Sequence, residues 1–299
     1  MKDIKTANGT IVPRIGLGTF PFEGRIMADM VKSAMTIGYR LFDTADDYRG
    51  ESGIGMAIKE LCEEGSFKRE DFFIQTKISD NNAHADEPLS GVYFNPHSRF
   101  MKRHTVEEIV REKVYNSLSE LGTTYLDSLL IHYPFPDYSL DIWRVMISLK
   151  EEGLVRYIGV SNFHERHIEK LIKETKVQPE INECYASPIG IKQSLVDYCS
   201  SHGCQFMTYS PLMDLAAGRI DSSAIQPLAE KYGKSIAQII IRWNIDRGCI
   251  PLPKSKNPKR LLENFNAFDF SLTEEEVEYI SSLNKDYQYL VESKICPGL

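Results

Sequence analysis

Short apolar runs alternate along this chain with longer stretches in which apolar side chains recur every three or four residues. Eight runs have the β-branched and aromatic composition of buried strands, at residues 14–18, 40–43, 72–77, 127–132, 155–160, 180–184, 205–210 and 249–252. Strands that alternate with helices pair in parallel through helical crossovers, so the pattern predicts an α/β fold. Eight such units suit a closed (β/α)8 TIM barrel, and an open doubly wound sheet of similar length also fits the period.

The stretches between the apolar runs carry the start and stop signals of helices. Thr105 and Glu108 have the spacing of a capping box, which predicts that a helix begins there. Gly38, Gly122 and Gly233 each follow a helical period and are interpreted as the points where helices end.

Two segments fall outside the repeat. Residues 5–13 contain Asn8 and Gly9, a two-residue turn signal that predicts a β-hairpin before the first barrel strand. Residues 79–104 form a long connection after the third strand, at the end of the barrel where active sites lie, with no helical period. A connection of this length is either a lid over the site or a surface loop, and both readings stay open. The loop also contains acidic and imidazole side chains, at Asp80, His84, Asp86, His97 and His104. No two of them have the short spacing of a known metal site, so no metal site is predicted.

Charge and composition narrow the class of protein. The chain has 35 Lys and Arg against 42 Asp and Glu, a net charge of −7 over 299 residues, and no basic block. We therefore expect neither nucleic acid nor an anionic membrane as a partner. No run reaches the roughly 18 apolar residues of a membrane span, and the first residues lack the apolar core of a signal peptide.

The six cysteines are scattered without paired spacing, which is typical of reduced thiols in a cytoplasmic protein. No stretch has the composition of a linker, so residues 1–299 are expected to form one domain. We expect a monomer or a weak oligomer that acts on a small molecule.

Four polar side chains follow the ends of successive predicted strands. Asp43 closes the second strand, Tyr48 lies just beyond it, Lys77 ends the third and His132 ends the fourth. Taken singly, each has a structural explanation, such as a surface lysine or a core histidine. Together they predict a proton-transfer unit, because the carboxyl ends of barrel strands meet on one face. An adjacent ammonium is expected to lower the pKa of the Tyr48 phenol from about 10 toward neutrality.

The segment from Gly38 to Tyr48, GYRLFDTADDY, resembles the signature that aldo-keto reductases carry around their catalytic Asp and Tyr. QTK at residues 75–77 and LIHYP at 130–134 resemble the segments that hold the catalytic Lys and His of that family. Four further matching segments follow in family order, GVSNF at 159–163, TYSPL at 208–212, IPLPKS at 250–255 and RLLENF at 260–265. The resemblance extends over about 270 residues.

The resemblance implies a (β/α)8 barrel that binds NADP(H) in extended form and transfers a hydride reversibly between the nicotinamide and a carbonyl carbon. By this resemblance Tyr48 is the general acid, tuned by a Lys77 that pairs with Asp43, and His132 orients the carbonyl. Because all four residue types are present, an enzyme is favoured over an NADP(H)-binding regulatory or redox-sensing subunit with little turnover. An aldolase that uses Lys77 for a Schiff base is disfavoured, because residues 251–256 contain no phosphate-binding glycine.

The resemblance also assigns cofactor contacts. Ser161 and Asn162 are expected at the carboxamide, with Tyr209 stacked on the ring. Two cations and a hydroxyl at Lys254, Ser255 and Arg260 suit a 2′-phosphate, which favours NADPH over NADH, although a basic loop before a solvated helix has the same pattern. The full expected cofactor set is Gly18, Thr19, Asp43, Ser161, Asn162, Glu183, Tyr209, Ser210, Leu212, Lys254, Ser255, Arg260, Glu263 and Asn264. The expected substrate contacts are Phe20, Tyr48, Tyr93, Phe94, His132 and Tyr133.

Three positions depart from the family pattern. Glu183 stands where the family usually has a Gln that contacts the carboxamide, and a carboxylate accepts hydrogen bonds but cannot donate them. Its charge beside the ring is expected to favour oxidised nicotinamide. Tyr133 and Phe20 stand where Trp is usual, which keeps aromatic walls of smaller size. The segment from Gly16 to Gly18 lacks the third glycine of a Rossmann fingerprint, so a Rossmann site is not expected.

Overall fold

The computed structural model describes residues 4–5, 9, 11–79 and 104–291. Its main sheet has eight parallel strands in chain order, β3 (Gly16–Gly18), β4 (Leu41–Asp43), β5 (Phe73–Ile78), β6 (Leu126–Ile131), β7 (Val155–Ser161), β8 (Ile181–Tyr185), β9 (Gln205–Tyr209) and β10 (Ile250–Leu252). Each strand lies within two residues of a predicted apolar run. The eight predicted strands are therefore confirmed.

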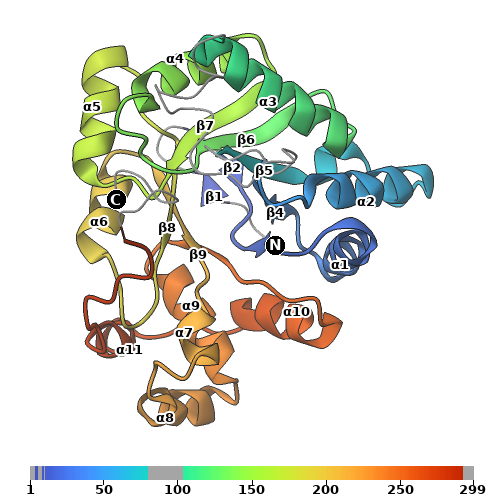
Figure 1. Ribbon diagram of the computed structural model, residues 1–299. Coiled ribbons are helices and arrows are strands. Elements are labelled where there is room, and N and C mark those ends of the chain that lie inside the picture. The colour runs from blue at the N-terminus through green and yellow to red at the C-terminus, as the bar shows by residue number, and fades with distance from the viewer. Residues whose placement is uncertain (1–3, 6–8, 10, 80–103, 292–299) are drawn as a thin grey trace.

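The sheet curves round until its first and last strands meet. The Gly18 N–H donates a hydrogen bond to the Pro253 carbonyl at 3.2 Å. Glycine is needed on this side, since a Cβ at Gly18 would lie 3.1 Å from the Leu252 carbonyl oxygen. The fold is thus a TIM barrel and not an open sheet. Figure 1 shows its strands and the surrounding helices from one side.

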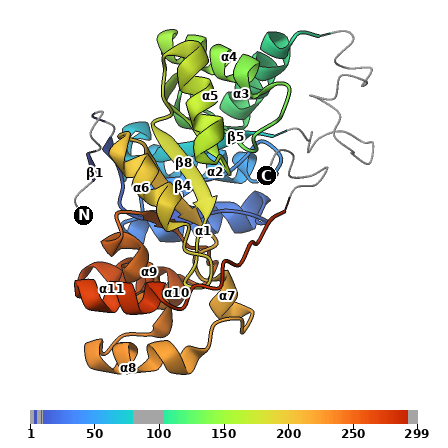
Figure 2. The same cartoon turned by 90° about the vertical axis from the view of Figure 1, so that its left-hand side faces the viewer.

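Helices enclose the barrel. They are α1 (Gly24–Ile37), α2 (Glu51–Glu63), α3 (Val106–Leu121), α4 (Ser139–Glu151), α5 (Glu165–Thr175), α6 (Gln193–Ser201), α7 (Met213–Ala216), α8 (Ser222–Tyr232), α9 (Ile236–Asp246), α10 (Pro258–Phe265) and α11 (Glu274–Ser281), with 3-10 turns at Arg69–Asp71 and Asn266–Phe268. Figures 1 and 2 place α8 and α11 on the side of α9 that faces away from the barrel. The Lys231 ammonium of α8 pairs with Glu276 of α11 at 2.7 Å.

The predicted helix boundaries are present. Thr105 Oγ1 accepts from the Glu108 N–H at 3.2 Å and Glu108 Oε2 accepts from the Thr105 N–H at 2.7 Å, which is the capping box at the start of α3. Gly122 and Gly233 cap α3 and α8 with left-handed φ angles of 62°. The residue after α1, Gly38, has a φ of 126°. Positive φ is the reason that glycine stands at these stops.

The predicted hairpin closes the bottom of the barrel. Strands β1 (Ile4–Lys5) and β2 (Ile11–Val12) pair antiparallel. Val12 is fully buried and packs with Leu41, Leu130 and Ile181 from the barrel strands, so the hairpin covers the end opposite the strands' carboxyl termini. Within the described ranges, the helices are too short or too polar to cross a membrane.

Candidate active site

A cavity of about 810 Å³ lies at the carboxyl ends of the strands. It is lined by the predicted site residues Gly18, Thr19, Phe20, Asp43, Tyr48, His132, Tyr133, Ser161, Asn162, Glu183, Tyr209, Ser210, Leu212, Lys254, Ser255, Arg260, Glu263 and Asn264. Lys77 stands behind this wall, with a side chain that is fully buried. Tyr93 and Phe94, and the lid expected from residues 79–104, lie outside the described residues except at the ends of that segment. The strand pattern thus brings segments from the whole chain to one cavity.

Lys77 is held by oxygen atoms of neighbouring strands. Its Nζ lies 2.5 Å from Asp43 Oδ1 and donates to the Thr44 carbonyl at 2.9 Å. A second carboxylate is near, since Glu183 Oε1 lies 3.4 Å from the same Nζ. The Gln75 amide donates to Asp43 at 2.9 Å and to Glu183 at 2.7 Å. One ammonium, one amide and two carboxylates therefore form a connected cluster at the barrel centre.

Tyr48 presents its hydroxyl to the cavity beside His132. The Tyr48 oxygen lies 3.3 Å from His132 Nε2. The Lys77 ammonium is 5.3 Å from the centre of the Tyr48 ring, and the Phe20 ring is 5.0 Å away on another side. Tyr133 stacks on the His132 imidazole at 4.5 Å. The structure therefore brings together the four residues that the strand ends predict.

The pKa of Tyr48 moves opposite to the sequence expectation. Burial is the largest cause, and the charges of Asp43 and Glu183 add to it, so the pKa lies well above 10. Lys77 cannot reverse this direction because the two carboxylates that bind it compensate its charge. The prediction that the ammonium lowers the pKa of the phenol is wrong for the protein without bound ligands. Tyr48 is therefore protonated at neutral pH.

His132 is neutral across the physiological range. Burial lowers its pKa to about 3, and the positive charge of Lys77 acts in the same direction. Its Nδ1 lies 2.6 Å from the Ser79 hydroxyl oxygen, and Asp47 Oδ1 lies 3.8 Å from the same nitrogen. These contacts fix the inner edge of the ring, so that Nε2 faces Tyr48.

The sequence predictions did not include Ser79 and Asp47. A signal for Ser79 exists, because alternate residues of a strand share one face and Ser79 follows Lys77 by two positions. Asp47 adjoins Tyr48 and lines the cavity. Tyr289 and Leu290 also line it and were not predicted, since no motif marks them.

A second group of contacts stands across the cavity from Tyr48. Tyr209 donates from its hydroxyl to Asn162 Oδ1 at 2.9 Å, and the Asn162 amide donates to the His132 carbonyl at 3.1 Å. The Ser161 hydroxyl donates to the Glu183 carbonyl at 2.9 Å. Asn162 adopts a φ of 63°, which turns its backbone at the end of β7. The result is a polar wall with one aromatic ring.

One part of the cavity wall is cationic. Lys254 and Arg260 line it together with Ser255. Across the described ranges, neither cation is paired with a carboxylate. The nearby carboxylate Glu263 accepts a short hydrogen bond from Ser235. Two cations without acidic partners suit an anionic group of a ligand.

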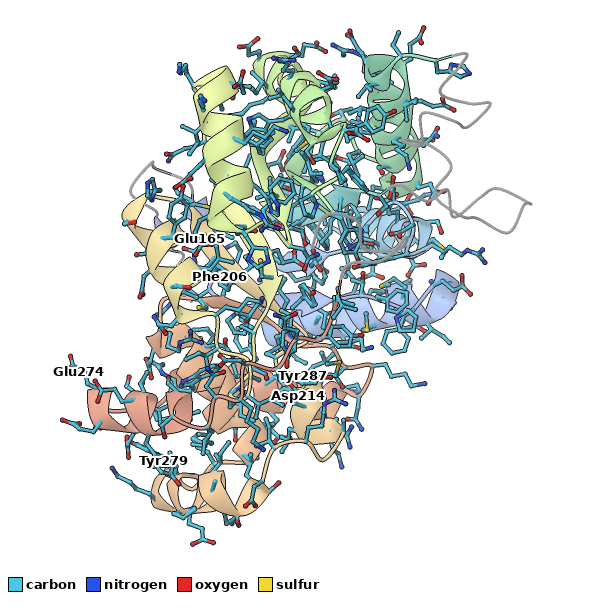
Figure 3. All side chains as sticks on the ribbon, turned by 60° about the vertical axis from the view of Figure 1, so that its left-hand side comes forward. Glu165, Phe206, Asp214, Glu274, Tyr279 and Tyr287 are labelled. Carbon is cyan, nitrogen blue, oxygen red and sulfur yellow. The ribbon has the colours of Figure 1, made fainter. Side chains whose placement is uncertain are left out.

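The segment after β9 and the segment around Tyr287 contact each other beside the cavity. Asp214, which is fully buried, accepts from the Arg219 Nε at 2.6 Å and from the Tyr185 hydroxyl. The Arg219 guanidinium lies 5.3 Å from the ring centre of Tyr287. Figure 3 shows Asp214 and Tyr287 close together. The segment after β9 and the segment that leads to Tyr289 thus form one wall.

A family model described as the Aldo/keto reductase family matches residues 14–285. The chain belongs to this family. Aldo-keto reductases are oxidoreductases that use nicotinamide cofactors. This chain is 36% identical over 284 residues to a methylglyoxal reductase of Escherichia coli O157:H7, and the aligned part covers 94% of this chain and 93% of the relative. It is 36% identical over 288 residues to a glyoxal reductase of Bacillus subtilis, with 96% and 94% covered.

Solved aldo-keto reductases have the same fold. An aldo-keto reductase of Bombyx mori in complex with NADP superposes with a TM-score of 0.83 at 32% identity, over 99% of this chain and 97% of that one. An aldose reductase of Schistosoma japonicum gives a TM-score of 0.84 at 30% identity, over 99% and 96%. The resemblance inferred from the motifs is confirmed.

The chemistry of the cavity fits a nicotinamide dinucleotide. Lys254 and Arg260, which have no carboxylate partner in the part of the chain that the structure describes, suit a phosphate. Tyr209 and the amide of Asn162 provide an aromatic face and polar atoms for the nicotinamide ring. The amide of Asn162 donates to the His132 carbonyl at 3.1 Å, so the predicted catalytic residues lie beside the atoms that suit the ring.

Proposed function

We propose that this aldo-keto reductase reduces small aldehydes or ketones with NADPH, with Tyr48 as the proton donor. The observation that carries the proposal is the placement of the Tyr48 hydroxyl 3.3 Å from His132 Nε2 at the cavity wall, with the Lys77–Asp43 pair behind it. The names of the relatives support 2-oxoaldehydes such as methylglyoxal and glyoxal as the first substrates to test.

Each residue has a defined role in this proposal. When bound, NADPH supplies the hydride that adds to the carbonyl carbon. Tyr48 donates its proton to the oxygen that becomes an alkoxide, and a high pKa of the phenol is no obstacle because an alkoxide is a stronger base. Neutral His132 orients the carbonyl oxygen beside the phenol. Lys77, fixed by Asp43, stabilises the phenolate that remains.

The preference for NADPH rests on the cationic part of the cavity wall. Arg260 offers a planar fork of donors and Lys254 a point charge, and a 2′-phosphate satisfies both. NADH has a hydroxyl at this position, so it gains none of the charge-assisted hydrogen bonds.

The test of the reductase proposal is the variant Tyr48→Phe. We expect steady-state oxidation of NADPH with methylglyoxal to fall by roughly 10²–10⁴-fold, because this phenol is the acid that we propose protonates the alkoxide. NADPH affinity, measured by fluorescence titration, should stay within about twofold of the wild type. Turnover above about a tenth of the wild-type value would exclude Tyr48 as the acid.

The test of the NADPH preference is Arg260→Ala. Loss of a charged hydrogen bond to phosphate predicts a Kd for NADPH roughly 10- to 100-fold weaker, with the Kd for NADH little changed. Lys259→Ala is the matched control, because Lys259 is a neighbouring exposed cation of α10 that does not line the cavity. Equal losses for NADPH and NADH would show that Arg260 does not bind the 2′-phosphate.

A further inference from the structure

Glu183 places a second buried carboxylate beside the Lys77–Asp43 pair. The residue lies on β8 and is 1% exposed. One of its oxygens is 3.4 Å from Lys77 Nζ, and the other accepts from the Gln75 amide at 2.7 Å. Gln75 uses the same amide nitrogen to donate to Asp43 at 2.9 Å. Glu183 is therefore part of the charged cluster and not an isolated wall residue.

The charges of this cluster do not cancel when Glu183 is ionised. Lys77 supplies one positive charge, and Asp43 and Glu183 supply two negative charges when both are ionised, while Gln75 is neutral. All three charged side chains are at most 5% exposed, so water screens the surplus negative charge weakly. A glutamine at position 183, the residue usual in the family, would leave the Lys77–Asp43 pair balanced.

The charge of an ionised Glu183 would face the part of the cavity that suits the nicotinamide ring. Glu183 lines the cavity together with Ser161, Asn162 and Tyr209. The oxidised ring carries a positive charge and the reduced ring carries none. All other parts of NADP⁺ and NADPH are identical, so a charge at this place acts on the difference between them.

We propose that Glu183 determines the preference of this enzyme for the redox state of its cofactor, by binding the cationic nicotinamide of NADP⁺ more tightly relative to NADPH than a neutral residue would. The inference rests on the proposed function, because it takes the cavity to be the nicotinamide site. It goes further by assigning the bias toward binding of the oxidised cofactor to one residue.

The redox state of the bound cofactor is also expected to change the protonation of Glu183. Burial and the neighbouring Asp43 raise the pKa of Glu183 well above its usual value, and Lys77 opposes them. A cation bound beside the carboxyl favours its ionised form. Binding of NADP⁺ is therefore expected to release a proton that binding of NADPH leaves in place.

The experiment compares the Kd values of NADP⁺ and NADPH in the wild type, Glu183→Gln and Glu51→Gln by isothermal titration calorimetry at pH 8. We expect the ratio of the Kd for NADP⁺ to that for NADPH to rise at least roughly fivefold in Glu183→Gln. Glu51→Gln is the matched control, since Glu51 is another buried glutamate but does not line the cavity. Its ratio should equal that of the wild type.

The outcomes separate this inference from the proposed function. An unchanged ratio in a folded Glu183→Gln overturns the role of Glu183. Failure of the wild type to bind either nucleotide overturns the proposed function instead. Adenosine 2′,5′-bisphosphate, which lacks the ring, should bind all variants equally and so reports that the cavity is intact. If Glu183→Gln does not fold, Glu183→Met provides a second uncharged side chain of similar length. The same rise in the Kd ratio is expected for it, and an unchanged ratio would contradict the role of Glu183.

Discussion

At the scale of the residue, the hydroxyl of Ser79 is the contact on which the orientation of His132 depends. It lies 2.6 Å from Nδ1, on the ring edge away from the cavity. Without it the ring keeps its stacking on Tyr133 but loses the polar contact that selects one of its two flipped orientations. Nε2 would then face Tyr48 only part of the time.

We therefore expect Ser79→Ala to lower kcat about tenfold with little change in the Kd of NADPH, since one hydrogen bond of about 1 kcal/mol is lost at the reacting end. Ser79→Thr, which keeps a hydroxyl, should recover most of the activity. Ser128→Ala is the matched control, because Ser128 is also a fully buried barrel serine, but its hydroxyl has no partner among the described residues. Equal kcat values for Ser79→Ala and Ser128→Ala would contradict the positioning role.

The residues that lie in recognisable motifs were predictable from the sequence. The residues that position or balance the charge of those motif residues were not. Asp43, Tyr48, Lys77 and His132 each follow an apolar run, so strand periodicity places them on one face. The compensation of Lys77 by Glu183 depends on two strands, β5 and β8, that are not neighbours in the sheet and face each other across the barrel. No local pattern of the sequence encodes that distance or the burial of Tyr48, which is the largest cause of its raised pKa, so the prediction for the direction of the Tyr48 pKa is wrong.

At the scale of the element, α2 and α3 cross at a glycine. A Cβ at Gly55 of α2 would collide with the Glu120 carbonyl oxygen and would lie 3.0 Å from the carbonyl carbon of Leu121, both in α3. These atoms belong to a helix backbone and cannot rotate away. The close approach is useful to the site, because it lets Lys113 of α3 reach Asp46 of the loop before Tyr48 at 2.7 Å.

Gly55→Ala should therefore destabilise the protein by roughly 1–3 kcal/mol, because overpacking forces α2 and α3 apart and outweighs the better helix propensity of alanine. Urea denaturation followed by circular dichroism measures the change. Ser52→Ala, at an exposed position of the same helix, should stay within about 0.5 kcal/mol of the wild type. A Gly55→Ala variant as stable as Ser52→Ala would mean that the crossing is not tight.

Helices and strands were predictable where a pattern of neighbouring residues marks them. Apolar runs gave the strands to within two residues, and the capping box of Thr105 gave the start of α3. The four-residue helix α7 has no such signal, since it is too short for a period and is held by contacts of Asp214 with Arg219 and Tyr185. Its position follows from tertiary structure alone.

At the scale of the whole molecule, Glu51 makes stability depend on pH. This carboxyl is buried between β5 and α3, where it accepts from Thr76 at 2.7 Å and Ser117 at 2.9 Å. Burial raises its pKa to about 7. The folded state then binds more protons than the unfolded state, whose carboxyl titrates near 4.5, so stability falls as the pH rises from about 4.5 to 7.

Glu51→Gln should remove this dependence. At pH 8 we expect the variant to be more stable than the wild type by up to about 3 kcal/mol, and at pH 4 to be about equal, because the wild-type carboxyl is then neutral. Thermal unfolding at both pH values measures the difference. A variant that is less stable by the same amount at pH 4 and pH 8 would show that the hydrogen bonds dominate and the charge does not.

The choice between a closed barrel and an open sheet could not be made from periodicity, since both have eight alternating units. It depends on whether the first and last strands meet, which is a contact between opposite ends of the sequence. The glycine at position 18 was visible in the sequence, but its reason, the approach of Leu252 and Pro253, exists only in the folded molecule.

The contact between Gly18 and Pro253 also sets an order of events on the ribosome. The wall that adjoins Gly18 is completed by Lys254 and Arg260, which leave the exit tunnel more than 100 residues after His132. A nascent chain that already contains Asp43, Tyr48, Lys77 and His132 therefore still lacks the closed ring and the cationic part of the cavity wall. Contacts of such long sequence separation form late in folding. The strand ends that carry Asp43, Tyr48, Lys77 and His132 are thus synthesised well before β10, whose contact with β3 closes the barrel.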